Sequence, residues 1–488
     1  MARFENNTSE QGLFLAIQLD KQFDKDSKEA RLKQFLIETV NLNDFEDAYK
    51  NDHCGRIVKN PIDMIAAILY GYITGVRSSR EIEKMLQTHI GFMYVSNRLS
   101  ADHSVICEFK ILFREQIEDI FHKLLFIMNE MGAIDWDIVA GDGTKIKAYA
   151  SKDLNVGKKR TELVLKSYRK LAEKIIRRDL ELEEDHTTGA IDEKKYREEK
   201  GRISRQQKVY ENVLGKIKEY QRNVESQKLN AEENHNLTDS DSKLMHSGSR
   251  DHFIQGYNMV LMVSNNDVIV DYRTITTIEK SYTGEMVHGV EDLKKEMGME
   301  KKATKYLMDA GFQDMEVILD LEAEGCQMYV ATKEKDFNEK SQKRRDFQVE
   351  RDENGYCLKC RNGLVTKGFY DSKNKTYSFF FRKKKCAGCL YLSECYCKIK
   401  DTTKQKTVVF KEFELLRRSE IDAYLHKMNS DEGKKTYSRR FGKEHVNANV
   451  KTQKNYHQTY YRGLGKVEME HCWVALSHNF MKYAQYVA

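Results

Sequence analysis

A charged stretch near the middle of the chain limits the folds that are open to it. Residues 155–230 are dense in Lys, Arg and Glu, and their apolar residues recur at spacings of three and four. That spacing predicts amphipathic helices, and a break at residues 186–189 divides the stretch into two of them. We therefore expect an antiparallel helical hairpin inserted into a larger domain. A solvated insertion without any chemistry is the plainer interpretation of this hairpin.

Strand patterns lie on both sides of the hairpin. Residues 134–144 form a short β-rich run that breaks at glycines, and residues 255–263 and 268–273 form two further runs joined by a turn at Asn265-Asn266. A helix, a strand that ends at Asp309, a second helix and a last strand follow. Three strands, a helix, a strand, a helix and a strand is the element order of the ribonuclease-H-like α/β fold.

The first 130 residues are expected to be all helical. Asn60 is a good N-cap before a proline at the first helical position, so a helix begins there and ends near Gly75. A second helix starts after Ser78, whose spacing from Glu81 suits a capping box, and a third is expected over residues 104–131. Short turns between helices suit helix-turn-helix DNA binding, and they suit any other small bundle equally well.

Composition narrows the class of protein. The chain has 488 residues, which suggests two to four modules rather than one core, and its net charge of +6 does not by itself indicate nucleic acid. The N-terminus lacks an apolar signal segment, and the most apolar run, residues 64–76, is too short to span a bilayer. Ten cysteines without a signal segment indicate reduced thiols, so we expect a cytoplasmic protein without a membrane anchor.

Two aspartates stand apart from the other acidic residues. Asp142 directly follows the apolar run 138–140, Asp309 directly follows 306–308, and small residues that leave room for a ligand flank both. A carboxylate at the inner end of a buried strand is costly unless it is paired or bound to metal. Two Mg²⁺ ions held by carboxylates can activate a nucleophile and stabilise the leaving oxygen of a phosphodiester.

The strongest local signal surrounds Glu444. It is the one acidic residue among nine Lys or Arg between residues 434 and 466. Tyr437, Arg440, Glu444 and Lys451 are spaced by three, four and seven, which on one helix places them close to one face. We expect a metal ligand flanked by two phosphate-binding cations and a phenol. A basic surface helix with an incidental glutamate is the alternative.

These residues resemble the DDE transposases of bacterial insertion sequences. Residues 437–451 match their Tyr-x₂-Arg-x₃-Glu-x₆-Lys signature, residues 60–80 are similar to the helical N-terminal domain of one such family, and residues 139–147, 238–258 and 308–312 are similar to its catalytic strand regions. The resemblance implies that two Mg²⁺ or Mn²⁺ ions bind at Asp142, Asp309 and Glu444. It also implies that the transposon end contacts Tyr437, Arg440 and Lys451.

The resemblance implies partners as well as chemistry. Such an enzyme binds double-stranded DNA, both the terminal inverted repeats of its element and the target, and pairs two ends as a homodimer. It would be cytoplasmic and associated with the nucleoid. A transposase-derived DNA-binding regulator without catalysis is the alternative function. A ribonuclease-H-like nuclease without transposition is a third possibility, but it does not explain the N-terminal helices.

A cysteine-rich segment precedes the glutamate region. Cys357 and Cys360 form one Cys-x₂-Cys pair and Cys386 and Cys389 form another, so four thiolates are present for a tetrahedral structural zinc site. Two further cysteines, at 395 and 397, leave the fourth ligand ambiguous. The resemblance does not settle this, although an insertion with a Cys-x₂-Cys element is common in the family. Reduced thiols packed in a small β insertion are the alternative.

The sequence thus predicts an α/β protein. Its ribonuclease-H-like catalytic domain is interrupted by a helical hairpin and by a cysteine-rich insertion, and an all-helical N-terminal domain precedes it. The expected boundaries are 1–130 for the DNA-binding helices, 131–154 for the first catalytic strand region, 155–235 for the charged helical insertion, 236–335 for the catalytic α/β core, 336–412 for the cysteine-rich insertion, and 413–488 for the C-terminal helical part with Glu444.

Overall fold

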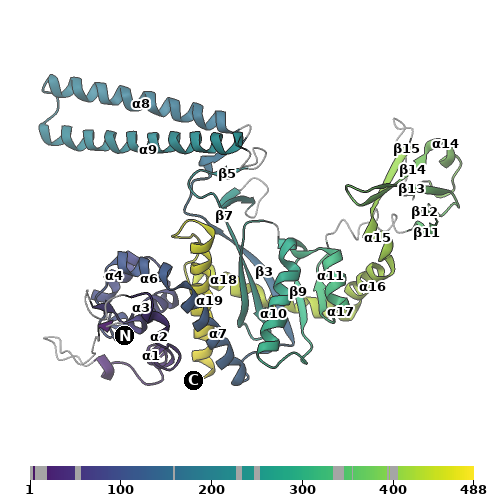
Figure 1. The fold of residues 1–488 in the computed structure, drawn as a ribbon, viewed down its shortest axis with the longest axis horizontal. Helices are drawn as coiled ribbons and strands as arrows, with labels where there is room; N and C mark the ends of the chain where they lie inside the picture. Colours follow the sequence, from purple (N-terminus) through teal and green to yellow (C-terminus); the bar gives the residue numbers. More distant parts are fainter. Residues whose placement is uncertain are drawn as a thin grey trace.

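The computed structural model (Figure 1) describes residues 4–5, 19–49, 57–157, 160–226, 234–246, 253–277, 279–332, 346–353, 355–392, 395 and 405–487. Helices from the N-terminal part lie at one side of a central sheet, a long helical hairpin projects from it, and a small separate sheet lies at the far end. Within these described ranges, no helix is both long enough and apolar enough to cross a membrane. The α/β class predicted from the sequence agrees with this mixed architecture.

The central sheet contains all the strands that the sequence predicts on either side of the hairpin. Its order is β10-β9-β3-β7-β6, and β8 also pairs with β7. Strands β3, β9 and β10 run parallel to one another, whereas β7 is antiparallel to β3, β6 and β8. Their bounds are Ile138–Lys147 for β3, Lys243–His246 for β6, Phe253–Ser264 for β7, Ile269–Ile275 for β8, Lys305–Met308 for β9 and Gln327–Val330 for β10.

The register of β3 and β9 places the two predicted aspartates side by side. Gly141 of β3 pairs with Met308, the last residue of β9. Asp142 and Asp309 are the next residues of their strands, so they lie at adjacent positions along the sheet. On one side of β3, Ile138 and Ala140 pack in a small buried cluster. Because side chains alternate along a strand, Asp142 continues that series.

The N-terminal helices form largely as the sequence predicts. Helix α3 (Pro61–Thr74) begins at Asn60, whose side chain accepts a hydrogen bond from the backbone of Ile62, and ends at Gly75, which adopts φ 79°. Helix α4 (Ser79–Thr88) starts after Ser78 as expected, but the Ser78 side chain makes no capping hydrogen bond. The capping box is therefore absent. The other helices in this part are α1 (Lys28–Thr39), α2 (Asn43–Glu46) and α5 (Ile90–Val95).

The single helix expected over residues 104–131 is wrong. The segment forms two helices, α6 (His103–Leu112) and α7 (Arg114–Glu130), separated at Phe113. Phe113 leaves the helical conformation with φ −106° and ψ 33°, and its buried ring packs against Phe45 and Phe109. The break at Phe113 lets its ring contact both Phe45 and Phe109. Helical spacing in the sequence does not reveal this packing.

A C-terminal helix joins the N-terminal helices to the sheet. Helix α19 (Leu464–Tyr486) is buried along most of its length and packs against α3, α7 and β8. Trp473 of α19 stacks on Tyr72 of α3 with ring centroids 6.0 Å apart. Buried Arg77 lies 3.6 Å from the carboxylate of Glu470 on α19. The N-terminal helices therefore share one continuous core with the central sheet.

The inserted hairpin forms as predicted. Helices α8 (Thr161–Thr187) and α9 (Glu193–Glu225) run antiparallel and project away from the sheet (Figure 1), and strands β4 (Asn155–Val156) and β5 (His235–Asn236) pair at its base. Only a few apolar residues on each helix are buried. Most of its charged surface faces solvent, in line with the plainer interpretation of a solvated insertion.

The cysteine-rich segment forms its own antiparallel sheet. Its strands follow chain order and are β11 (Gln348–Asp352), β12 (Gly355–Lys359), β13 (Val365–Asp371), β14 (Thr376–Arg382) and β15 (Gln405–Lys411), with the short helix α14 (Lys383–Cys386) after β14. Three helices then lead back to the central sheet: α15 (Glu412–Leu416), α16 (Arg418–Asn429) and α17 (Asp431–Ser438).

Candidate active site

Three carboxylates from distant parts of the chain meet around Arg440. One guanidinium nitrogen lies 3.0 Å from Glu444 Oε1. The other lies 2.9 Å from Asp142 Oδ1 and 3.8 Å from Asp309 Oδ2. The Arg440 side chain is 7% exposed, so these ion pairs are only weakly screened by water. We call Asp142, Asp309 and Glu444 the carboxylate cluster.

The glutamate region is not the single helix that its spacing suggests. Tyr437 belongs to α17, Arg440 to a 3-10 segment (Arg439–Lys443), and Glu444 is the first residue of α18 (Glu444–Thr452). The expectation of one helix is therefore wrong. The tighter 3-10 turn accompanies the burial of Arg440, whereas the residues on both sides of it are exposed. We call residues 439–452 the Glu444 segment.

Asp142 is the most enclosed member of the carboxylate cluster. Its Oδ2 accepts a hydrogen bond of 2.8 Å from the Asn447 side chain. Burial raises the pKa of Asp142; Asn447 and Arg440 oppose this effect, and the negative charges of Asp309 and Glu444 add to it. Glu444, by contrast, has a half-exposed side chain. The cluster therefore combines a desolvated carboxylate with one that is open to solvent.

Asp309 is fixed by the turn that follows β9. Its Oδ1 accepts a hydrogen bond of 2.7 Å from the backbone of Gly311, and it caps the short 3-10 helix Ala310–Phe312. Its Oδ2 faces Arg440. One carboxylate oxygen thus holds the loop while the other points into the cluster.

The two other predicted site residues differ in their surroundings. Tyr437 is partly buried against the Ile138 and Ala140 cluster, and burial raises its pKa. Lys451 is half-buried, and burial lowers its pKa, with a further lowering from nearby Lys145 and an opposing effect from Asp142. Lys145, three residues after Asp142, is a cation that sequence reasoning missed.

A further carboxylate and two amides also lie at this site and were not expected. Glu279 stands at the start of a 3-10 turn (Glu279–Tyr282), and its Oε1 accepts a hydrogen bond of 2.7 Å from Asn258 on β7. Burial raises the pKa of Glu279; Asn258 opposes this, and Asp309 and Asp142 add to it. Asn447, on α18, is the second amide. Glu279 follows no strand directly, so no local sequence signal marks it.

The chemistry of these side chains suits a hard divalent cation. In the part of the chain that the structure describes, no three His, Cys, Asp or Glu side chains converge closely enough to hold a metal, and Arg440 lies between the three carboxylates. Two buried amide oxygens, Asn447 Oδ1 and Asn258 Oδ1, have no hydrogen-bond partner. Buried polar atoms are rarely left without one. Carboxylate and amide oxygens are the ligands that Mg²⁺ and similar ions prefer.

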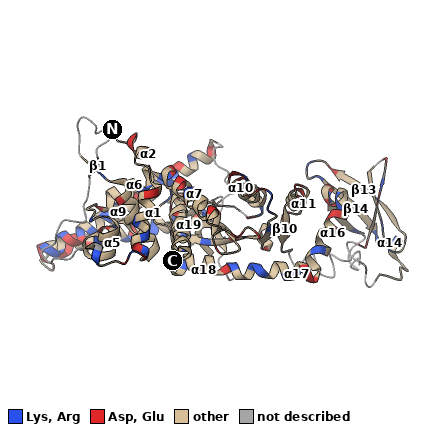
Figure 2. Cartoon of the chain, turned by 90° about the horizontal axis from the view of Figure 1, so that it is seen from below, with Lys and Arg blue, Asp and Glu red and all other residues tan. Residues whose placement is uncertain are grey.

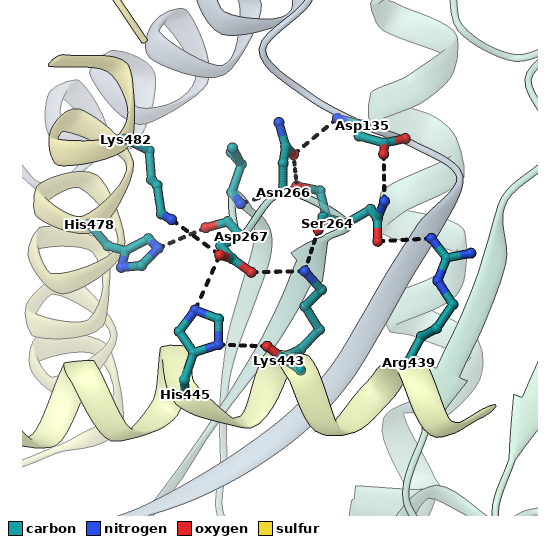
Figure 3. Close-up of polar contacts among 12 residues, drawn as sticks. Asp135, Ser264, Asn266, Asp267, Arg439, Lys443, His445, His478 and Lys482 are labelled. Atoms are coloured by element: carbon teal, nitrogen blue, oxygen red, sulfur yellow. Dashed lines mark hydrogen bonds and ion pairs between the residues drawn. The ribbon is translucent and has the colours of Figure 1, made fainter. Parts of the chain in front are cut away.

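A second polar cluster holds the Glu444 segment in place (Figure 3). Asp267 lies in the turn between β7 and β8 with φ 70°. Its carboxylate is 2.9 Å from Lys443 Nζ, 3.1 Å from His445 Nε2 and 3.2 Å from Lys482 Nζ. Its backbone carbonyl accepts a hydrogen bond of 2.8 Å from His478 Nε2. We call these five residues the Asp267 cluster.

The Asp267 cluster ties the Glu444 segment to the sheet and to α19. Lys443 and His445 are the immediate neighbours of Glu444 in the chain, while His478 and Lys482 belong to α19. Burial alone would raise the pKa of Asp267, but its ion pairs with Lys443 and Lys482 leave that pKa below the ordinary value. The backbone on both sides of Glu444 is therefore anchored to one carboxylate.

The predicted zinc ligands do not come together as a set. Within the described residues no cysteine group has metal-binding geometry. Cys357 alternates along β12 with Tyr356 and Leu358, which face the small sheet's core, so Cys357 faces the other side. Cys360, Cys386 and Cys395 pack against that core. Burial raises the pKa of the Cys386 thiol, and Cys395, Cys360 and Cys389 raise it further. Cys397 lies outside the described residues.

Two family models match parts of the chain. The family model described as a transposase DDE domain matches residues 356–484, and a transposase domain (DUF772) matches residues 17–111. The first match includes the Glu444 segment and most of α19, the second includes most of the N-terminal helices, and Asp142 and Asp309 lie outside both. Comparison with curated proteins found no matching relative. The two family matches support a transposase of the insertion-sequence kind.

Proposed function

We propose that this protein is a DDE transposase that cleaves DNA at the ends of an insertion sequence and joins the ends to target DNA. The observation that carries the proposal is the meeting of Asp142, Asp309 and Glu444 at one guanidinium, although 135 or more residues separate them in the sequence. A ribonuclease-H-like catalytic domain is part of this proposal. The order of strands and helices along the chain and the parallel β3, β9 and β10 support it.

The carboxylate cluster is proposed to hold two Mg²⁺ or Mn²⁺ ions. When bound, such ions supply an activated water or 3′ hydroxyl and stabilise the leaving oxygen. The residues of the chain position the ligands. Asn447 orients Asp142, the backbone of Gly311 orients Asp309, and the Asp267 cluster fixes the backbone beside Glu444.

The DNA is proposed to approach along the Glu444 segment. Lys and Arg residues recur along α17 and the 3-10 segment that follows it, and α18 adds Lys451, at the lower edge of Figure 2. Lys451 has no ion pair within the described residues, so its charge is available to a phosphate. Arg440 can grip a phosphate with two hydrogen bonds, but in this structure it faces the carboxylates. Tyr437, beside Arg440, is the third proposed contact with the transposon end.

The wider setting follows the same proposal. The substrate is double-stranded DNA with terminal inverted repeats, together with a target duplex, and two copies of the chain pair the two ends. The N-terminal helices are proposed to bind DNA, and the protein is proposed to act in the cytoplasm on the nucleoid. Two family matches, one over the N-terminal helices and one over the Glu444 segment, support a chain that combines both parts.

The cysteine-rich sheet is proposed to bind one structural zinc ion. Cys395, Cys360 and Cys389 lie close enough to Cys386 to raise the pKa of its thiol, and this supports a ligand set with Cys395 in place of Cys357. We expect elemental analysis to find zinc in Cys357→Ser and to lose it in Cys395→Ser. Zinc-free wild-type protein would contradict the proposal.

The direct test is cleavage of end DNA in the presence of Mg²⁺. We expect wild-type protein to nick the DNA at the element boundary. Asp142→Ala, Asp309→Ala and Glu444→Ala should each abolish cleavage and retain end-DNA binding, because each removes a ligand and leaves the basic surface intact. Near-normal cleavage by any one variant would remove that residue from the site. Specific binding without cleavage by the wild type would favour the regulator.

A further inference from the structure

Glu279 reaches the carboxylate cluster from an element that lies outside the three predicted motifs. The close approach of its carboxylate to two glycines, Gly143 and Gly311, defines its position. A Cβ built on Gly143, the residue after Asp142, would lie 2.6 Å from Glu279 Oε1, and one built on Gly311, two residues after Asp309, would overlap Glu279 Oε2. Because neither glycine has a side chain, the Glu279 carboxylate can lie between strand β3, which carries Asp142, and the turn after β9, which carries Asp309.

The Glu279 carboxylate lacks the partners that a buried negative charge needs. Its one hydrogen-bond donor among the described residues is the neutral side chain of Asn258, at 2.7 Å, and no cation lies within ion-pair distance. Its charged neighbours are Asp309 and Asp142, which carry the same sign and raise its pKa, and Lys145, which carries the opposite sign and lowers it. Glu279 is partly buried, and a charge there without an ion-pair partner is costly, so this placement favours a compensating ligand or a proton.

Asn258 provides an independent observation that points to a ligand. It is 3% exposed, and because its Nδ2 donates to Glu279, its Oδ1 faces away from that carboxylate oxygen. This Oδ1 has no hydrogen-bond partner, and it lies 2.9 Å from the same point in front of Gly143 that Glu279 Oε1 approaches. A hard cation accepts amide and carboxylate oxygens together.

From these contacts we infer that Glu279 is a fourth carboxylate of the metal site, with Asn258 as its positioning residue and a divalent cation as the shared ligand. The inference rests on the proposed function, because it takes the carboxylate cluster to be a metal site. It adds a ligand that neither the Tyr-Arg-Glu-Lys signature nor the two aspartate motifs contains. It also gives a reason for glycine at 143 and 311, since a side chain at either position would displace Glu279.

The test measures metal binding by the full-length protein without DNA. Free Mn²⁺ is followed by electron paramagnetic resonance during titration of the wild type, Glu279→Gln, Asp142→Asn and the control Glu285→Gln. Glu285 is exposed on α10 (Thr283–Glu296), six residues further along the chain. We expect Glu279→Gln to weaken Mn²⁺ binding by about tenfold or more, within the range found when groups that support a metal site are removed. Glu285→Gln should bind like the wild type.

The melting temperature, measured with and without Mn²⁺, provides a second test of the inference. Without metal, Glu279→Gln should melt at or above the wild-type temperature, because the amide keeps the shape and removes a like charge. With Mn²⁺, the rise in melting temperature should be smaller than for the wild type. A Glu279 that is merely a protonated structural residue predicts the same metal-induced rise in both.

The possible failures are distinguishable. If the wild type binds Mn²⁺, Asp142→Asn loses it and Glu279→Gln does not, the role of Glu279 is overturned and the proposed metal site stands. If the wild type binds no Mn²⁺, both are overturned. If Glu279→Gln does not fold, Gly143→Ala should show the same loss of Mn²⁺ affinity, because the nearest atoms to its added methyl group belong to Glu279 and Asn258, and normal affinity would contradict the inference.

Discussion

Two polar clusters hold the Glu444 segment, and they solve opposite electrostatic problems. The carboxylate cluster gathers three acidic groups around the guanidinium of Arg440, with Glu279 near Asp309 and Asp142, and leaves buried amide oxygens without partners. The Asp267 cluster gathers two lysines and two histidines around one acidic residue. In the carboxylate cluster the acidic groups outnumber the cations that contact them, whereas in the Asp267 cluster the basic groups outnumber the single carboxylate.

This difference distinguishes the carboxylate cluster, which is proposed to take part in the reaction, from the Asp267 cluster, which holds the backbone in place. A group of like charges destabilises the fold unless a ligand balances it, so its persistence points to function. A satisfied ion-pair network stabilises the local backbone and can hold a functional residue in place. The two clusters meet at Glu444, whose carboxylate belongs to one and whose chain neighbours, Lys443 and His445, belong to the other.

The largest expected contrast is in catalysis. Glu444→Gln should abolish strand cleavage, because it removes a proposed ligand. Asp267→Asn should slow cleavage by about ten- to a hundredfold, which is the cost of a small misplacement of a catalytic group. Its effect should fall on kcat rather than on DNA affinity, and Asp267→Glu should restore part of the rate. Asp320→Asn is the control, since Asp320 pairs with Arg417 on another surface. An equal loss of rate in Asp320→Asn would remove the special role of Asp267.

Stability should change in opposite directions at the two clusters. Without metal, Asp142→Asn should leave the free energy of unfolding unchanged or raise it, because burial and like charges already disfavour the ionised form of Asp142. Asp267→Asn should lower it by about 3 kcal/mol, since breaking a largely buried ion pair leaves unpaired cations. Urea denaturation at pH 7 measures both. The comparison fails if Asp142→Asn is the more destabilising of the two.

Acid should weaken the support around Asp267 through His478. Burial, together with Lys454 and Lys482, lowers the pKa of His478 to about 4, although the contact with Asp267 opposes the shift. Because the folded pKa lies below the unfolded value of about 6.5, the neutral form contributes stability above pH 6.5, and this is lost as the pH falls toward 4.

The size of this loss gives a direct test. It should amount to about 3 kcal/mol. Urea midpoints of the wild type should therefore decline between pH 6.5 and pH 4, and His478→Gln should show a shallower decline. The same decline in both proteins would show that His478 does not titrate in this way. His471, whose pKa burial lowers to about 3, should contribute separately.

The smallest expected effect concerns DNA binding. Lys451→Ala should weaken binding of end DNA and reduce the slope of log affinity against log salt by about one unit, because one phosphate contact is lost. The slope should change less for Arg440→Ala, since three carboxylates already neutralise that charge. Fluorescence anisotropy across a salt series measures the slopes, with exposed Lys295 as the control position. Unchanged slopes for Lys451→Ala would exclude a phosphate contact.

Much of the fold could be predicted because local sequence patterns determine many of its helices and strands. Apolar runs mark the strands at Asp142 and Asp309, although β3 continues to Lys147 past the glycines where the sequence suggested a break. Helix α3 begins at Asn60 and ends at Gly75 as capping chemistry requires. The hairpin of α8 and α9 follows from its helical spacing. Two helix breaks were missed, at Phe113 and at Arg439–Lys443, because tertiary packing of Phe113 and Arg440 overrides a pattern that is helical throughout.

The candidate site was predictable only in part. Asp142 and Asp309 could be found because each directly follows a short apolar run, and Glu444 because it is alone among cations. Glu279, Asn258 and Asp267 carry no such mark. Glu279 reaches the site across two glycines, and Asp267 acts through a turn that meets α18 and α19. Their roles depend on which loops the sheet brings together.

Strand joining tests the central claim most directly. Pre-cleaved end DNA with a free 3′ hydroxyl is incubated with a target plasmid, Mg²⁺ and either the wild type or Asp309→Ala. The account predicts joined product with the wild type, none without divalent metal, and none with Asp309→Ala, although both proteins bind the end DNA. Tight and specific binding by the wild type with no joined or cleaved product at any Mg²⁺ or Mn²⁺ concentration would contradict it.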